Sequence, residues 1–160
     1  MDLKIKKILE RLIKEDLSVS TMESCTSGLL CSSLTDVEGA SKVIKGGYIT
    51  YTNNQKINVG VSDEIIKQYG VYSIECSVDM AKKALSLTNS DISIGVTGSL
   101  GNIDPNNKDS VAGEIYYTIM IKDKVYSKKI SLKDKKQFLT KVCVIPPPTL
   151  CLEEGELRIL

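Results

Sequence analysis

The spacing of hydrophobic residues changes period repeatedly along this 160-residue chain, and this alternation limits the folds that it can adopt. An amphipathic helix is predicted over residues 2–15, where hydrophobic residues recur three and four positions apart. The pattern further predicts strands at residues 17–22, 43–52, 92–96, 115–121 and 125–131, and helices at 26–35 and 74–88. Ser62 and Ser73 are predicted helix N-caps, and Gly70 is a predicted helix stop between them. Strands that alternate with helices predict a mixed sheet with helices on its faces, an α/β fold in one domain.

Composition narrows the class of protein further. The net charge is +1 and only two residues are arginine, so direct contact with nucleic acid is not expected. The five cysteines are odd in number and form no C-x-x-C pair, which argues against a disulfide framework or a zinc site. The sequence has no apolar signal core and no apolar run of 18 residues, so we expect a cytoplasmic protein without membrane contact.

The segment from Met22 to Gly28 combines candidate nucleophiles with a chain that has no histidine. Serine–histidine and cysteine–histidine catalysis are therefore excluded, and a general base must be lysine, tyrosine, a carboxylate or water. Ser24 follows a predicted strand and precedes a helix, where backbone N–H groups favour a developing negative charge. Helix capping is the alternative interpretation of the same residues. Cys25 is either a rival nucleophile, with a thiol pKa lowered by the helix dipole, or a small buried hydrophobic residue.

A second candidate segment extends from Gly46 to Lys56. Gly46 and Gly47 indicate a bulge or a close backbone approach within a strand. Lys56 can act as a base if burial or a neighbouring phenol lowers its pKa, and Tyr51 can bind the amine or relay a proton. An exposed lysine and a packed tyrosine are the alternative interpretation.

A third candidate segment, from Gly95 to Gly101, places a glycine-rich loop after an alternating strand. Such a loop allows the backbone to approach a phosphate or a ribose. The spacing matches neither the Walker A motif nor the G-x-G-x-x-G dinucleotide-binding motif. A loop that only turns the chain is the alternative interpretation.

The three segments together resemble the CinA C-terminal domain family. The matching motifs are E-S-C-T-x-G from Glu23, G-G-x-x-x-Y-x-N-x-x-K from Gly46 and G-V-T-G-x-x-G from Gly95, and the resemblance covers residues 2–142. It implies a single three-layer α/β/α domain in its free-standing form. It also implies a nicotinamide-nucleotide amidase, which converts nicotinamide mononucleotide to nicotinate mononucleotide and ammonia in pyridine nucleotide salvage.

The resemblance also assigns roles to individual residues, without a metal or a cofactor. Ser24 is implied as nucleophile, Lys56 as base and Tyr51 as an assisting residue. Support for the nucleophile and the oxyanion falls on Glu23, Cys25, Thr26 and Gly28, with N–H groups of the following helix as oxyanion donors. Substrate contacts are expected at Gly46, Gly47, Asn53, Thr97 and Gly98. A small molecule is the expected partner, in a homo-oligomer such as a dimer.

Other readings of the chain stay open at this point. A non-catalytic nucleotide-binding or interaction protein of the competence or DNA-damage response is the main alternative, and a hydrolase that uses Cys25 is another. Two positions differ from the usual family pattern. Ser27 replaces a glycine, which is expected to crowd the oxyanion site. Gly101 is followed by Asn102, whereas the family usually has Gly-Pro there.

The end of the chain has an unusual composition. A helix is predicted to begin at Asp134, and the prolines at 146–148 prevent its continuation. We therefore divide the chain into an amidase-like domain at residues 1–142 and a proline-containing tail at residues 143–160. The composition is compatible both with a natural tail and with an altered reading frame.

Overall fold

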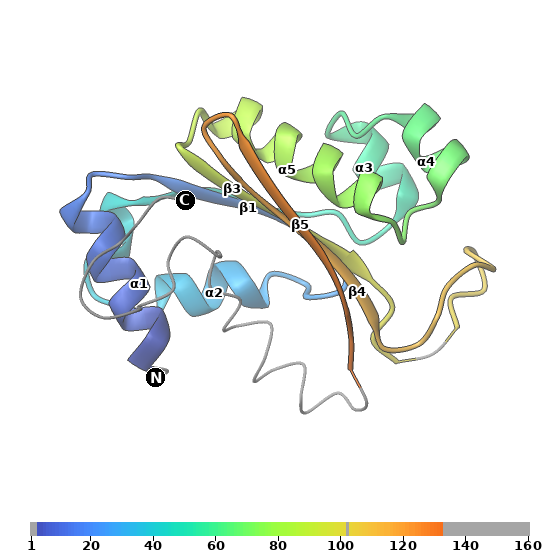
Figure 1. The fold of residues 1–160 in the computed structure, drawn as a ribbon, viewed down its shortest axis with the longest axis horizontal. Helices are drawn as coiled ribbons and strands as arrows, with labels where there is room; N and C mark the ends of the chain where they lie inside the picture. The colour runs from blue at the N-terminus through green and yellow to red at the C-terminus, as the bar shows by residue number, and fades with distance from the viewer. Residues whose placement is uncertain (1–2, 102, 133–160) are drawn as a thin grey trace.

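The structure, a computed structural model, describes residues 3–101 and 103–132 (Figure 1). Its elements in chain order are α1 (Leu3–Lys14), β1 (Val19–Glu23), α2 (Leu29–Thr35), the 3-10 helix η1 (Ala40–Lys42), β2 (Ile44–Ile49), α3 (Asn53–Asn58), α4 (Asp63–Tyr69), α5 (Ile74–Thr88), β3 (Ile92–Gly98), β4 (Glu114–Ile121) and β5 (Lys124–Ser131). Within the described ranges, no helix is both long and apolar enough to cross a bilayer.

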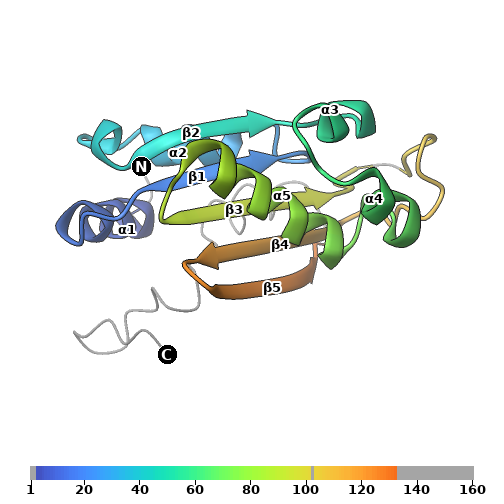
Figure 2. The same cartoon turned by 90° about the horizontal axis from the view of Figure 1, so that it is seen from above.

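The five strands form one mixed sheet in the order β2-β1-β3-β4-β5. Strand β1 pairs in parallel with both β2 and β3, whereas β3 with β4 and β4 with β5 pair antiparallel. Helices α1 and α2 cover one face of the sheet, and α3, α4 and α5 lie on the other (Figures 1 and 2). The predicted three-layer α/β/α fold with a mixed sheet is therefore confirmed.

The hydrophobic core fills the space between the sheet and its two helical layers. On one face, Leu9 and Leu12 of α1 are buried against Val19 and Ile119 of the sheet. On the other face, Met80 and Ala84 of α5 pack with Met22 of β1. Both clusters rest on β1, which lies near the centre of the sheet and is buried along its whole length.

Helix α2 begins three residues later than the sequence pattern predicted. Ser27 has φ 51° and Gly28 has φ 89°, so both residues lie in the left-handed region of backbone conformation. Two consecutive left-handed residues cannot continue a right-handed helix. The segment from Ser24 to Gly28 is consequently a turn, and α2 starts at Leu29.

The two glycines in β2 have the structural role that the sequence indicated. The register between β1 and β2 shifts at Val19/Ser20, next to Gly46. A Cβ atom on Gly47 would lie 2.8 Å from the Cys31 Sγ atom, which is too close for any side chain. The bulge and the close approach predicted here are both present, and they let α2 pack directly on β2.

Several predicted boundaries are also confirmed. The Ser62 and Ser73 hydroxyls accept hydrogen bonds from the first turns of α4 and α5, as expected of N-cap residues. Gly70 ends α4 as predicted. The helix expected from residue 134 and the domain boundary at residue 142 lie outside the described residues.

Candidate active site

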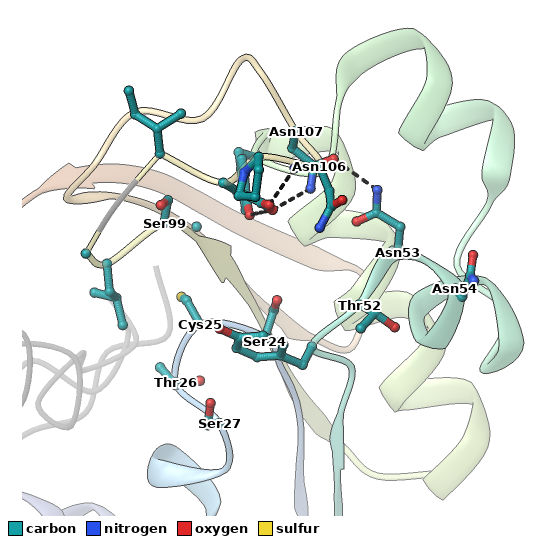
Figure 3. Close-up of a pocket in the computed structure, with 18 of the residues that line it drawn as sticks. Ser24, Cys25, Thr26, Ser27, Thr52, Asn53, Asn54, Ser99, Asn106 and Asn107 are labelled. Atoms are coloured by element: carbon teal, nitrogen blue, oxygen red, sulfur yellow. Dashed lines mark hydrogen bonds between the residues drawn. The ribbon is translucent and has the colours of Figure 1, made fainter.

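A pocket of about 960 Å³ lies where the carboxyl ends of the parallel strands β1, β2 and β3 meet (Figure 3). The chain passes from β1 outward to β2 and then returns across β1 to β3, so the strand order reverses at β1. Ligand sites in open α/β sheets form at this kind of reversal. The residues that line the pocket are Ser24, Cys25, Thr26, Ser27, Leu29, Tyr51, Thr52, Asn53, Asn54, Tyr72, Gly98, Ser99, Leu100, Gly101, Ile103, Asp104, Pro105, Asn106 and Asn107.

The most informative contact joins Ser24 to Lys56 beneath this pocket. The Lys56 Nζ atom donates a hydrogen bond of 3.0 Å to the Ser24 Oγ atom and another of 2.8 Å to the Thr50 carbonyl. Lys56 is only 1% exposed, and Ser24 is buried as well. A nucleophilic hydroxyl and an amine are thus held at hydrogen-bond distance away from bulk water.

The local sequence explains how Lys56 reaches this position. Strand β2 ends at Ile49, and the Thr52 hydroxyl caps α3 by accepting a hydrogen bond from the Gln55 N–H. The short helix α3 then turns Lys56 inward, toward the end of β1. The Thr50 carbonyl, itself fully buried, fixes the amine from the strand side.

Burial lowers the pKa of Lys56 below its ordinary value, because desolvation disfavours the charged ammonium. The thiols of Cys76 and Cys25 and the Asp104 carboxylate oppose this shift to a smaller extent. A lowered pKa increases the fraction of neutral amine, the form that can accept a proton. The sequence analysis required burial of the Lys56 amine if this residue is to act as a base, and the structure meets that condition.

Glu23 caps helix α2 rather than contacting Ser24. Its carboxylate accepts hydrogen bonds from the N–H groups of Leu30 (3.0 Å) and Cys31 (2.8 Å) and from the Thr21 hydroxyl (3.2 Å). These first-turn N–H groups of α2 are thus occupied. The expectation that they act as oxyanion donors is wrong, because a buried carboxylate already satisfies them.

Other donors beside Ser24 remain available. Within the described residues, the N–H groups of Cys25 and Thr26 are paired with no backbone carbonyl. The Thr26 hydroxyl is buried and has no hydrogen-bond partner there either. In the described part of the chain, the turn after β1 thus places two N–H groups without a carbonyl partner and one hydroxyl without a hydrogen bond directly after Ser24.

Cys25 lines the pocket, but its environment does not activate its thiol. Burial raises the pKa of Cys25 to about 12, with smaller opposing effects from nearby backbone N–H groups and from Lys56. The hypothesis of a thiol with a lowered pKa is therefore wrong. At neutral pH this thiol stays protonated, which makes it a poor nucleophile.

Some of the remaining predicted site residues line the pocket, and the others do not. Tyr51 lines the pocket but is 69% exposed, and its hydroxyl makes no hydrogen bond to any described residue, so the structure does not bring it to the Lys56 amine. Asn53 and Gly98 also line the pocket.

The other predicted positions serve the fold. Gly46 and Gly47 lie within β2 and do not line the pocket. The Thr97 hydroxyl is fully buried and donates to the Val71 carbonyl at 2.8 Å. Gly28 forms the left-handed turn before α2, and a Cβ atom there would lie 3.0 Å from the Ile49 side chain.

The sequence interpretation did not identify the opposite wall of the pocket, which is organised around Asp104. The Asp104 Oδ2 atom accepts hydrogen bonds of 2.6 Å from both the Tyr72 hydroxyl and the Asn107 amide nitrogen. The Asn107 Oδ1 atom accepts a bond of 2.9 Å from Asn53, at the start of α3 (Figure 3). The D-P-N-N segment at residues 104–107 is a turn signal that could have suggested an ordered loop.

Fold and site together define the class of protein: a three-layer α/β/α domain with a buried serine–lysine pair at the carboxyl ends of its parallel strands. The sequence model of the CinA C-terminal domain family matches residues 2–145. The chain belongs to this family.

Individual relatives agree with this assignment. A CinA-like protein of Fervidobacterium nodosum is 35% identical over 135 residues, which cover 84% of this chain and 33% of that protein. The chain thus spans about a third of the length of this relative.

Two crystal structures have the same fold. A competence-damaged protein (CinA) superfamily protein from Escherichia coli superposes with a TM-score of 0.80 at 26% identity, over 88% of this chain and 81% of the other. The competence/damage inducible protein CihA from Agrobacterium tumefaciens superposes with a TM-score of 0.76 at 26% identity, over 89% and 93% of the two chains.

Proposed function

We propose that this protein is an amidohydrolase that removes the amide nitrogen of nicotinamide mononucleotide, giving nicotinate mononucleotide and ammonia. The hydrogen bond of 3.0 Å between the Lys56 amine and the Ser24 hydroxyl carries this proposal. The resemblance of the three sequence motifs to enzymatic CinA-type domains supplies the substrate. The chemistry requires neither histidine nor metal.

In the first half of the reaction, the neutral Lys56 amine accepts the Ser24 proton while the Ser24 Oγ atom attacks the carboxamide carbon. Negative charge then develops on the carbonyl oxygen. The N–H groups of Cys25 and Thr26 are the oxyanion donors that we propose, since Glu23 occupies those of Leu30 and Cys31. The Lys56 ammonium returns the proton to the amide nitrogen, the C–N bond breaks, and ammonia leaves an ester on Ser24.

In the second half, Lys56 accepts a proton from a water molecule, and the resulting hydroxide attacks the ester carbon. The C–O bond to Ser24 breaks, and Lys56 returns the proton to the Ser24 oxygen. The products are a carboxylic acid and the unmodified enzyme. Each proton taken by Lys56 is given back within the same half-reaction, so the cycle closes without another acid.

Ammonia release from nicotinamide mononucleotide by the purified protein tests the proposal. We expect turnover by the wild type and a loss of at least about 100-fold in Ser24→Ala. Cys25→Ala is the matched control at the neighbouring position, and we expect it to retain activity because the Cys25 thiol is protonated. Turnover in Ser24→Ala that is abolished in Cys25→Ala would instead assign the nucleophile to Cys25.

The same assay separates the enzyme from a non-catalytic module. Binding of nicotinamide mononucleotide, measured by calorimetry, with no ammonia released from any pyridine carboxamide would support the binding module. Equal activity in the wild type and in Ser24→Ala would show that the observed hydrolysis does not use this serine.

A further inference from the structure

Asp104 is the one described residue of the pocket lining whose side chain is charged at neutral pH. The lining contains no described lysine or arginine, and Lys56 lies beneath it rather than in it. The polar neighbours of Asp104 on this wall include the Tyr72 hydroxyl and the amides of Asn53, Asn106 and Asn107. A wall with one fixed carboxylate and several amides offers hydrogen bonds to hydroxyl groups and no ionic partner to a phosphate.

Three donors hold the Asp104 carboxylate in place. The Tyr72 hydroxyl and the Asn107 amide each donate to Oδ2 at 2.6 Å, and the Asn106 N–H donates to Oδ1 at 2.9 Å. The hydrogen bond from Tyr72, followed by those from Asn107 and Asn106, lowers the pKa of Asp104, so the side chain stays ionised. It can then act only as an acceptor.

The number of acceptor positions leaves room for a ligand. A carboxylate offers about four lone-pair positions, and the three donors occupy one on Oδ1 and two on Oδ2. No described residue donates to the second position on Oδ1. The Asn107 and Asn53 amides keep fixed orientations, because Asn107 directs its nitrogen to Asp104 and its oxygen to Asn53.

Among the described residues, each of these amide nitrogens makes one hydrogen bond and has a second N–H on the same wall as Asp104. An acceptor with donors next to it complements a pair of adjacent hydroxyl groups, each of which can donate to one neighbour and accept from another. Carboxylates bind ribose hydroxyls in this way at other nucleotide sites.

We propose that Asp104 binds the ribose hydroxyls of the substrate, and that recognition depends on the ribose rather than on the phosphate. This inference rests on the proposed function, because the carboxamide must lie at Ser24 for the sugar to reach the opposite wall. A phosphate close to Asp104 would be repelled, so it points toward solvent at the mouth of the pocket. The substrate class is therefore pyridinium ribosides, with or without a 5′-phosphate.

The test compares three ligands that share the pyridinium carboxamide: nicotinamide mononucleotide, nicotinamide riboside and 1-methylnicotinamide, which lacks the sugar. In Asp104→Asn we expect kcat/KM for both ribosides to fall about 10- to 100-fold, the range for losing a hydrogen bond to a charged group. Values for 1-methylnicotinamide should stay within about threefold. Asp109→Asn removes the same charge from an exposed position in the same loop and should leave all three unchanged.

Equal losses for all three ligands, or no loss for the ribosides, would overturn the proposal. A wild-type preference of more than about 100-fold for the mononucleotide over the riboside would overturn it as well, since the phosphate would then be recognised. If Asp104→Asn does not fold, Tyr72→Phe provides the second variant, because it removes one of the donors that hold the carboxylate. A riboside-specific loss in Tyr72→Phe supports the proposal, and its absence counts against it.

Failure of the proposed function would be visible separately. If the wild type hydrolyses none of the three compounds, calorimetric Kd values replace kcat/KM. A Kd for nicotinamide mononucleotide that rises at least tenfold in Asp104→Asn, with that for 1-methylnicotinamide unchanged, would support ribose binding in a protein that is not an amidase. If the wild type hydrolyses none of the compounds and Asp104→Asn binds nicotinamide mononucleotide as tightly as the wild type does, both the amidase proposal and ribose binding by Asp104 are overturned.

Discussion

Replacing Lys56 by methionine gives the most direct test of the serine–lysine pair. Methionine has nearly the same length and volume but no amine, so it removes the proposed base and leaves the buried space filled. We expect kcat for ammonia release to fall by about 10²- to 10⁴-fold, the usual contribution of a positioned general base. Fluorometric ammonia detection measures this directly.

The stability of the same variant should change much less than its activity. Lys56→Met removes hydrogen bonds to Ser24 and Thr50, each with a net contribution of about 1 kcal/mol. It also removes the cost of burying an amine in a side chain that is only 1% exposed. The two effects oppose each other, so we expect the free energy of unfolding to change by no more than about 2 kcal/mol.

The pH dependence of the free energy of unfolding tests whether the pKa of Lys56 is lowered, because lowered and raised values predict changes of opposite sign. Because desolvation lowers the pKa of Lys56 in the folded state, the unfolded chain binds more protons between that pKa and the ordinary value of 10.5. Wild-type stability should therefore rise relative to Lys56→Met as the pH increases through this window. One proton gives a slope of up to about 1.4 kcal/mol per pH unit.

Urea unfolding followed at several pH values, together with activity at the same values, checks these expectations. Wild-type kcat should also increase with pH as Lys56 loses its proton. A variant that keeps more than a tenth of wild-type activity would refute Lys56 as the base. A stability difference that falls with rising pH would refute the lowered pKa.

Three further substitutions test the structure around this pair. Glu23→Gln should lower the free energy of unfolding by about 1–3 kcal/mol in chemical denaturation, because an amide cannot accept both helix N–H groups as a carboxylate does; an unchanged midpoint would contradict the capping role. Ser27→Gly should raise the melting temperature, since a left-handed residue costs about 1–2 kcal/mol unless it is glycine. Ammonia release in the same variant tests whether the Ser27 side chain crowds the site. Gly95→Ala should cost about 3 kcal/mol or more, because its Cβ atom would lie 2.3 Å from a carbonyl oxygen of α5; soluble protein with a wild-type melting temperature would refute the close packing.

The elements that the sequence predicted well are those whose signals are local. Helix α5 (Ile74–Thr88) has a serine N-cap and a regular apolar face, and its observed bounds are those predicted. Strands β4 and β5 alternate clearly and are joined by a short turn. The start of α2 was predicted wrongly because two left-handed residues interrupt a helical pattern, and Ser27 carries no sequence signal for that conformation.

The candidate site was predictable only in part, since its contacts join distant parts of the chain. Ser24 and Lys56 are 32 residues apart, and no periodicity indicates that they meet. Their pairing was expected from the resemblance to a family rather than from chemistry. Asp104 lies between β3 and β4, and Tyr72 lies between α4 and α5. Only the folded structure shows that the two side chains share a hydrogen bond.

The turn after β1 also explains how one short segment serves both helix capping and the proposed chemistry. Side chains along an extended strand point alternately to opposite faces of the sheet. Glu23 faces the layer that contains α2 and caps it, whereas Ser24 contacts Lys56 of α3 in the opposite layer (Figure 1).

This separation has a chemical consequence. A carboxylate on the same face as Lys56 would stabilise its ammonium form and raise its pKa, which would reduce the neutral amine needed to activate Ser24. A one-residue shift in the register of β1 would exchange the two faces and place Glu23 beside the amine. The register of β1 against β2 and β3 therefore bears directly on the proposed mechanism, because it keeps Glu23 away from the Lys56 amine.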